Sequence, residues 1–548
     1  MICDKLSHSL HYIPMTKKIF SAAIWAIAPA FFMATTIIGA VRWFSPVPFW
    51  DMWDGTLGFY IERLQGDHWA PFVEQANEHR IVLSKILFWI DYRFFGGLSK
   101  FLIAMNVALM FALWVTLCWV ARSLLNRRLA FLCSALTGVL CFSWLQAENI
   151  NWGYQSQFYL AYLLPLLALI SMARWIQEPR ERRFAIAVAL GVLSTGTMAN
   201  GLLALPLLVL MLFLSGRNSR RRMSALLLVT ALTLAAWAYR YQVVHHPATS
   251  PKLMAEFLLI FLGGTFGFLF HVDQLTMLVG AGVICAGAYV ALRWATGERD
   301  PMFLALALFV VYVGAAAGAA TIGRAYFGIY AALAGRYETP LLLLYSVLLM
   351  LFAYLYRNGR STYAVVGVLS VFTPLLLAVP QMGAFDQAGP ARAFQRMHVA
   401  LALDLGVEDD AQIGTIYLAE RAKQNAREAM RYNLSVFALP LLRTAREAIG
   451  KSPVSLGLEA CQSSVDKTNI ISTDKRFASV EGWAFNNKTT TVPPIVFFVT
   501  NGAVSGVALT GGDRPDVQRV ISQKALRAGF SGYALNYDAH TLSVYCQQ

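Results

Sequence analysis

Charged residues are scarce in this sequence. Asp, Glu, Lys and Arg make up only 14% of its 548 residues, whereas 57% are hydrophobic. Several soluble domains of this total length would need more charge to cover their surface, so most of the surface must face lipid. The formal net charge of +14 does not indicate nucleic acid, because the basic residues form short clusters between apolar runs. We therefore expect membrane lipids, and no nucleic acid, among the partners.

Sequence patterns for cofactors are also missing. The seven cysteines form no CxxC pair and no zinc-type spacing, and the adjacent pair His245 and His246 has no third ligand nearby. No P-loop, dinucleotide fingerprint or hydrolase elbow is visible. We expect no cofactor, and a divalent metal is not indicated. Cys461 and Cys546 bracket the polar C-terminal segment, and an oxidising compartment would allow them to form a disulfide.

Long apolar runs dominate the first 380 residues. The first run follows Lys17 and Lys18 and is too long for a signal peptide, so we expect a retained span with a cytoplasmic N-terminus. Applying the positive-inside rule to the arginine clusters then gives about eleven spans. These lie near residues 19–41, 99–121, 129–147, 157–175, 184–200, 201–215, 223–242, 275–292, 302–321, 338–356 and 362–380. Residues 255–270 are apolar but break this parity, and we interpret them as a re-entrant or interfacial helix broken by Gly263, Gly264 and Gly267.

The odd number of spans places the C-terminal part outside the membrane, opposite the N-terminus. We predict a membrane domain over 1–380, an external helical segment over 381–455 and an external β-sandwich over 456–548. The helical pattern of the second part comes from its alternating charges and spaced apolar residues. The third part has short β-like runs between Gly, Asn, Asp and Pro turns, at a size typical of a sandwich.

The first external loop, 43–98, is rich in acids and aromatics. Asp51 and Asp54 follow the first span closely, and a carboxylate at the membrane rim can act as a general base for an acceptor hydroxyl. The alternative is that both are solvated loop residues or helix caps. Further along the loop, residues 81–95 are typical of an amphipathic helix at the interface.

A charged cluster follows in the same loop. Glu78, His79, Arg80 and Lys85 place several cations near one another, which suits a phosphate, although an exposed helix start has the same pattern. Polar residues at other external span ends are functional candidates too. We expect all of them to face one external cavity with Asp51 and Arg80; these further residues are Asn151, Gln155, Arg324, Arg336 and Tyr337.

This layout resembles the GT-C superfamily of polytopic membrane glycosyltransferases. The matching features are a cytoplasmic N-terminus, an acidic pair in a long first external loop, interfacial helices behind it, many further spans and an external C-terminal domain. The likeness covers roughly residues 15–380, and the acidic motif, DMWD, departs from the DxD pattern. The fold class that we expect is thus a polytopic α-helical membrane bundle, GT-C-like, with an external helical segment and a small β-sandwich.

The resemblance implies a sugar donor carried on a polyprenyl phosphate, and a glycan or lipid-linked acceptor at the cell surface. It implies Asp51 or Asp54 as the catalytic carboxylate of an inverting transfer, and His79, Arg80, Lys85 or Arg336 as phosphate ligands. The expected location is a bacterial inner membrane with a periplasmic C-terminal domain. The alternatives are a flippase for a lipid-linked saccharide, a polysaccharide polymerase or ligase, and a scaffolding protein. The flippase is disfavoured because few charges fall at mid-span and no inverted repeat is visible.

Overall fold

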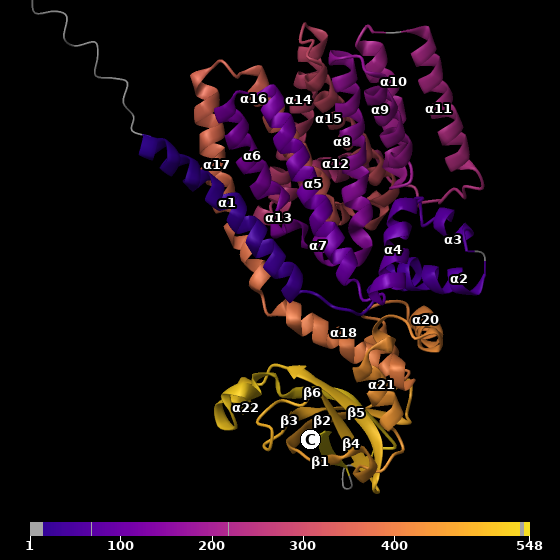
Figure 1. Ribbon diagram of the computed structural model, residues 1–548. Helices are drawn as coiled ribbons and strands as arrows, with labels where there is room; N and C mark the ends of the chain where they lie inside the picture. Colours follow the sequence, from indigo (N-terminus) through magenta and orange to yellow (C-terminus); the bar gives the residue numbers. More distant parts are fainter. Residues whose placement is uncertain (1–14, 67, 218, 538–541, 548) are drawn as a thin grey trace, which may run out of the picture.

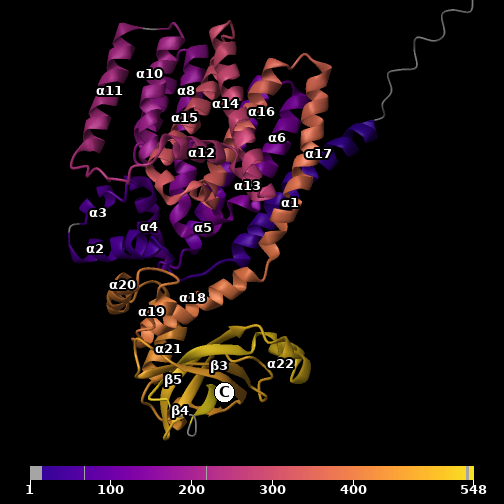
Figure 2. The ribbon, with the colours of Figure 1, turned by 180° about the vertical axis from the view of Figure 1, so that it is seen from behind.

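The computed structural model describes residues 15–66, 68–217, 219–537 and 542–547, with side chains described from residue 26 onward. A bundle of helices occupies one end of the molecule and a β-sheet the other end (Figure 1). A group of shorter helices lies between them, and the same order is seen from behind (Figure 2).

The bundle makes this chain an integral membrane protein. Among the described residues, eight helices are long and apolar enough to cross a membrane. They are α5 (Lys100–Leu124), α6 (Arg127–Cys141, continued by short helices to Asn151), α8 (Ser156–Gln177), α11 (Arg220–Ala238), α14 (Asp273–Ala295), α15 (Pro301–Arg324), α16 (Glu338–Leu355) and α17 (Arg360–Met382). The helices α6, α8, α15 and α16 are mostly buried within the protein, whereas α11 and α14 are largely exposed on its periphery.

The predicted number of eleven spans stays a prediction. Two of the predicted segments form the shorter helices α9 (Glu181–Ser194) and α10 (Ala204–Leu214). A third forms α1 (Met15–Arg42), of which only the part from Ala26 has described side chains. The paired helices α12 (Pro251–Leu262) and α13 (Gly264–Phe270) bring the eight long helices to nine if they count as one span.

The chain bends by 77° between α12 and α13, at Gly263, within the segment where the sequence predicts a break. Glycine is required there by close packing. A Cβ on Gly263 would lie 2.0 Å from the carbonyl oxygen of Thr276 in α14, and a Cβ on Gly280 would lie 2.0 Å from that of Leu259 in α12. The two backbones therefore touch where a side chain has no room.

The first external loop folds into short helices at the end of the bundle that faces the sheet (Figure 1). A π-helical turn, η1 (Trp53–Gly58), leads into α2 (Phe59–Gln65) and α3 (Ala70–Val73). The amphipathic helix expected over 81–95 is α4 (Val82–Phe95).

Four helices connect the bundle to the sheet: α18 (Ala388–Leu405), α19 (Asp410–Ile413), α20 (Ala419–Tyr432) and α21 (Pro440–Ala448). Of these, α18 packs on one face of the sheet, where His398 stacks on Tyr533 with ring centroids 4.7 Å apart. The Tyr533 hydroxyl donates to Asp409 at 3.0 Å, just before α19.

The C-terminal region is one seven-stranded antiparallel sheet, so the predicted two-sheet sandwich is corrected. Its spatial order is β1-β7-β4-β5-β6-β3-β2. The strands are β1 (Leu458–Ala460), β2 (Gln462–Ile470), β3 (Phe477–Phe485), β4 (Ile495–Thr500), β5 (Ala503–Gly512), β6 (Gly529–Leu535) and β7 (Ser543–Gln547). The two edge strands, β1 and β2, are consecutive in the chain. One short stretch of chain therefore forms both edges, and the sheet is rolled so that these edges lie close together.

The physical reason for this difference is visible in β4. Val496 and Phe498 point into the rolled sheet, whereas Phe497 and Val499 point outward and are equally buried. The outward residues belong to the core formed with the connecting helices. Helices thus cover the face that a second sheet would cover in a sandwich, and the alternation of side chains along a strand does not reveal which of the two does so.

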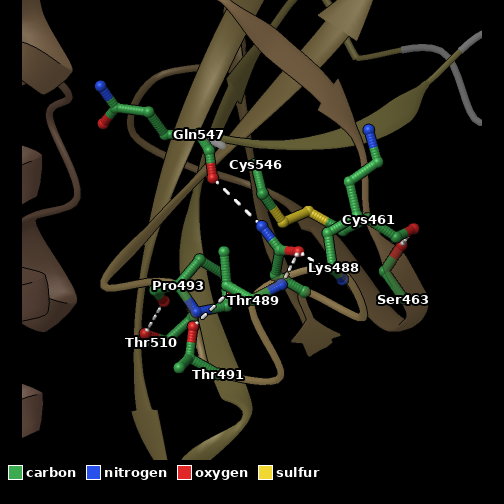
Figure 3. Close-up of a disulfide and its surroundings, with 10 residues drawn as sticks. Cys461, Ser463, Lys488, Thr489, Thr491, Pro493, Thr510, Cys546 and Gln547 are labelled. Atoms are coloured by element: carbon green, nitrogen blue, oxygen red, sulfur yellow. Dashed lines mark hydrogen bonds between the residues drawn. A yellow bond between two sulfur atoms is a disulfide. The ribbon is translucent and has the colours of Figure 1, made fainter.

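A disulfide joins Cys461, between β1 and β2, to Cys546 on β7, with the two Cα atoms 5.6 Å apart (Figure 3). It lies where the chain changes partners, because β1 pairs with β7 and β2 pairs with β3. Beside it, the Asn486 side chain donates to the carbonyl of Gln547 at 3.2 Å. These contacts hold the rolled edge in place.

Replacing both Cys461 and Cys546 by Ser is expected to destabilise the sheet by about 2–5 kcal/mol, because the crosslink restricts a long stretch of the unfolded chain. Thermal unfolding of the purified protein, followed by tryptophan fluorescence, measures the effect. The matched control is Cys285→Ser, which removes a free cysteine of α14. Equal melting of the double variant and the control would contradict a stabilising role.

Candidate functional site

A cavity of about 970 Å³ lies where the first external loop, the ends of several spans and α18 meet. The structure brings most of the predicted site residues together here. The predicted residues that line the cavity are Asp51, Glu78, His79, Asn151, Gln155, Arg324, Arg336 and Tyr337. Three other predicted residues, Asp54, Arg80 and Lys85, are not among its lining residues.

Short helices at the span ends deliver these side chains. The chain leaves α6 through α7 (Ala147–Asn151) and enters α8 through η3 (Gly153–Gln155). The end of α15 and the turn η7 (Gly335–Tyr337) supply the opposite group of arginines and tyrosine. Polar side chains are costly inside a membrane span. They therefore lie at this end of the bundle, where short helices interrupt the spans.

Asp51 is a half-buried carboxylate on the cavity wall. No hydrogen bond or ion pair reaches its carboxylate from the described part of the chain. Burial raises the pKa of Asp51, and nearby Asp54 raises it further, while Arg336 and Arg324 partly offset the rise. The preceding residue, Trp50, has the left-handed φ of 47°, and its N–H donates to the carbonyl of Ile416 at 2.9 Å. Such backbone strain persists only where the surroundings hold it.

Asp54 has a different environment, although it is only three residues away. Its carboxylate accepts hydrogen bonds from Tyr417 at 2.7 Å and Asn425 at 3.0 Å, and it pairs with Arg421 at 3.2 Å. All three partners belong to α20 or the turn before it. The structure therefore separates the two aspartates: Asp51 faces the cavity and Asp54 anchors the external helices to the first loop.

Two of the cavity arginines are already paired with acids. Arg324 lies 2.9 Å from Glu78, which also lies 3.2 Å from His246. Arg336 lies 3.2 Å from Glu148, and its backbone N–H donates to the same carboxylate at 3.0 Å. Each pair fixes a guanidinium at the wall of the cavity and compensates its charge.

The remaining cations of the predicted cluster bind backbone. The Arg80 guanidinium donates to the carbonyls of Val73 and Tyr239 at 2.5 and 2.6 Å. The Lys85 ammonium donates to those of Pro71 at 2.5 Å and Glu74 at 3.0 Å. Burial lowers the pKa of Lys85 to about 8. These two side chains hold the loop together, and their donors face carbonyl oxygens.

His79 lines the cavity but serves the protein's own backbone. Its Nδ1 accepts a hydrogen bond from the N–H of Ala199 at 3.2 Å, which ties the first loop to η4 (Ala199–Leu203). Burial lowers the pKa of His79. A neutral ring that accepts through Nδ1 supplies no positive charge for a phosphate.

Three amide side chains line the cavity with unpaired polar atoms. Both polar atoms of Asn151 and of Gln155 are buried without a hydrogen-bond partner in the described protein, as is the Oδ1 of Asn200. Gln155 is 1% exposed. Buried polar atoms without partners are costly, so these atoms are free to bind water or a ligand in the cavity. Aromatic rings of Trp152, Tyr154 and Phe158 lie along the same cavity.

Among the charged and amide side chains that line the cavity, sequence reasoning missed Asn200, Arg392 and Arg396. Asn200 sits in a polar break between two apolar runs, and that break was the available signal. The two arginines lie on α18, beyond the last span, where charge is ordinary on a soluble helix. Within the described residues, no group of three or more His, Cys, Asp or Glu side chains is placed to hold a metal ion.

Comparison with known proteins gives limited matches. No family model matches this chain. No curated protein matches it. Among solved structures, one that is similar is a crystal structure of an Archaeoglobus fulgidus oligosaccharyltransferase in complex with zinc and sulfate. It has 15% identity and a TM-score of 0.34 over 62% of this chain and 52% of that one.

A second similar structure is the oligosaccharyltransferase AglB from Archaeoglobus fulgidus, bound to an inhibitory peptide and a dolichol-phosphate. It has 13% identity and a TM-score of 0.37, over 71% of this chain and 58% of that one. This chain thus spans little more than half the length of either neighbour. Both neighbours have a GT-C fold, the class that the sequence resembles. At these TM-scores, the likeness carries neither an activity nor a substrate to this chain.

Lys85→Met is expected to lower the stability by about 1–3 kcal/mol, because it leaves the buried carbonyl of Pro71 and the partly buried carbonyl of Glu74 without this donor. Thermal unfolding measures the loss, and binding of a polyprenyl phosphate is expected to stay unchanged. The control is Lys475→Met, an exposed lysine near β3. Unchanged melting with weakened phosphate binding would place Lys85 at the ligand.

Proposed function

We propose that this protein is a membrane glycosyltransferase. It moves a sugar from a polyprenyl-phosphate donor to a hydroxyl of a cell-surface glycan or a lipid-linked acceptor. The observation that carries the proposal is Asp51: a half-buried carboxylate, free of partners in the described chain, in a cavity that also holds arginines and unpaired amides. A base, a place for sugar hydroxyls and cations for a leaving phosphate are what this transfer needs.

The proposed reaction is an inverting displacement. Asp51 accepts the proton of the acceptor hydroxyl as its oxygen bonds to the anomeric carbon of the sugar. The bond from that carbon to the phosphate oxygen breaks on the opposite face, and the phosphate leaves with the bonding electron pair. Positive guanidinium groups in the cavity stabilise the charge that develops on the phosphate.

The binding roles follow from the unpaired atoms. Asn151, Gln155 and Asn200 offer donors and acceptors to sugar hydroxyls, and the aromatic rings beside them offer apolar faces to the sugar ring. Arg336 and Tyr337 lie on the wall formed by η7. Asp54 positions the turn that carries Asp51 and takes no part in the chemistry.

The proposed setting is a bacterial inner membrane with the N-terminus in the cytoplasm. The cavity is lined by residues of the first external loop and of α18, and these elements lie at the end of the bundle that faces the sheet, away from the start of α1 (Figure 1). In this orientation both the cavity and the sheet are periplasmic, where Cys461 and Cys546 meet an oxidising environment.

Asp51→Asn is expected to lower the transfer rate by about a hundredfold to ten-thousandfold, because the amide cannot accept the proton. The assay incubates purified protein with a panel of polyprenyl-phosphate sugars and a saccharide acceptor, and measures the glycosylated product. Asp54→Asn is expected to lose less rate, since only the positioning weakens. The control is Asp516→Asn in α22 (Pro515–Val520), because Asp516 is not among the residues that line the cavity.

Full activity of Asp51→Asn would contradict the assignment of the base. If the wild-type protein transfers no sugar but moves a lipid-linked saccharide across liposome membranes, the protein is a flippase and the proposed function is wrong.

Acidification is expected to lower the transfer rate. The fall is expected at a higher pH than the ordinary Asp pKa of ~3.9 would give. The sign follows from the base: Asp51 must be ionised, and burial raises its pKa, so protonation begins at a higher pH. Arg336→Gln removes the largest interaction that lowers this pKa and is expected to move the acidic limb to still higher pH. A kcat–pH profile of both proteins measures the shift, and an unchanged limb in the Arg336 variant would contradict this account.

A further inference from the structure

The cavity has two arginines whose charge nothing in the described protein compensates. Arg392 and Arg396 lie one turn apart on α18 and line the cavity together. Neither guanidinium donates a hydrogen bond or pairs with a carboxylate among the described residues. By contrast, the other two cavity arginines, Arg324 and Arg336, are each paired with a glutamate.

Aromatic rings hold the two side chains in place. The Arg392 guanidinium lies 5.1 Å from the ring centroid of Trp43, and that of Arg396 lies 3.8 Å from the ring centroid of Phe49. Both rings line the same cavity. Contact with a ring uses the flat face of a guanidinium and leaves the N–H groups at its edge free to donate.

The packing around the pair fixes its position at the membrane end of α18. The indole N–H of Trp43 donates to the carbonyl of Gly383 at 3.2 Å, and Arg42 donates to the carbonyl of Phe385 at 3.0 Å. A Cβ on Gly389 would come within 2.8 Å of the Trp43 ring, so the helix passes directly against that ring. The pair therefore sits at the junction of α1, α17 and α18.

The charge balance of the cavity calls for an anion. With Arg324 and Arg336 compensated by Glu78 and Glu148, the lining charges that remain are two arginines and Asp51. Like charges one turn apart repel each other, and Arg396 is largely buried, so burial and Arg392 together lower its pKa to about 10. An anion bound between the two guanidinium groups would relieve both costs.

We propose that Arg392 and Arg396 form the binding site for the phosphate group of the lipid carrier. This inference rests on the proposed function for the identity of the carrier, but the anion site itself stands on the geometry. It assigns the phosphate to the external helix that follows the last span. The sequence analysis had included Arg336 among the phosphate ligands. In this proposal the arginines that are paired with glutamates instead stabilise the wall of the cavity and lower the pKa of Asp51.

The site is tested by binding, independently of transfer. Full-length protein in phosphatidylcholine nanodiscs is titrated with a short-chain polyprenyl phosphate and with the uncharged polyprenol of equal chain length. The wild type is expected to prefer the phosphate. The double variant R392Q/R396Q is expected to lose about tenfold or more of that preference, since charge-assisted hydrogen bonds are lost, with polyprenol binding unchanged.

Two further variants make the result specific. R427Q removes an exposed arginine of α20 outside the cavity and is expected to keep the full preference. R392K/R396K keeps both charges without the planar forks, and an intermediate preference is expected. It also provides the test if the Gln variant melts at a lower temperature than the wild type.

Retention of the preference in R392Q/R396Q would overturn the site. Displacement of the polyprenyl phosphate by equimolar phosphatidylglycerol would overturn its assignment to the carrier, since the site would then bind phospholipid headgroups in general. Displacement by inorganic phosphate alone, at millimolar concentration, with no contribution of the polyprenyl chain to binding, would likewise overturn the assignment to the lipid carrier. Arginine-dependent binding without any sugar transfer would support this site and count against the proposed function, so the two failures are distinguishable.

Discussion

The attachment of the external helices to the first loop is the constraint on which the site depends. Asp54 accepts hydrogen bonds from Tyr417 and Asn425, and Asn425 also donates to the carbonyl of Trp53 at 2.9 Å. On the other side of Asp51, the N–H of Trp50 is bound to the carbonyl of Ile416. The backbone on both sides of Asp51 is thus held by α20 and the turn before it, while the Asp51 carboxylate has no partner in the described chain. A loop tied at these points presents a carboxylate at low entropic cost.

The same attachment explains why both the membrane bundle and the external helices contribute residues to the cavity wall. Membrane helices supply the amides and the paired arginines, whereas α18 supplies the unpaired ones. Among the described residues, Arg324 and Arg336 are each paired with a glutamate from another element, whereas Asp51, Arg392 and Arg396 face the cavity without such a partner. Because an ion costs free energy when it is buried without a partner, a bound anion would favour the partly buried Arg396 most, and the exposed Arg392 would add its charge to the same site.

Part of this arrangement could be predicted from the sequence. Apolar run length and arginine clusters located the main helices, and the break at Gly263 was visible from three glycines in one apolar run. Polar residues at span ends, such as Gln155 and Arg324, were found because ionisable and amide groups are expensive in lipid. The sequence does not reveal the partners of Arg80 and Lys85, because folding brings these side chains to the carbonyls of Tyr239 and Pro71.

The arginines that the sequence analysis missed show the same limit, because their surroundings too are set by the packing of the fold. In the segment PARAFQR, Arg392 and Arg396 have the spacing of any solvated helix face, and only the packing of α18 against Trp43 and Phe49 turns that face toward the cavity. The sheet adds to this effect, because His398, two residues past Arg396 on the same helix, stacks on Tyr533. Contact with the sheet on one side and with the aromatic rings on the other leaves α18 little freedom to rotate. The rolled sheet therefore acts as a support that fixes which face of α18 the cavity receives.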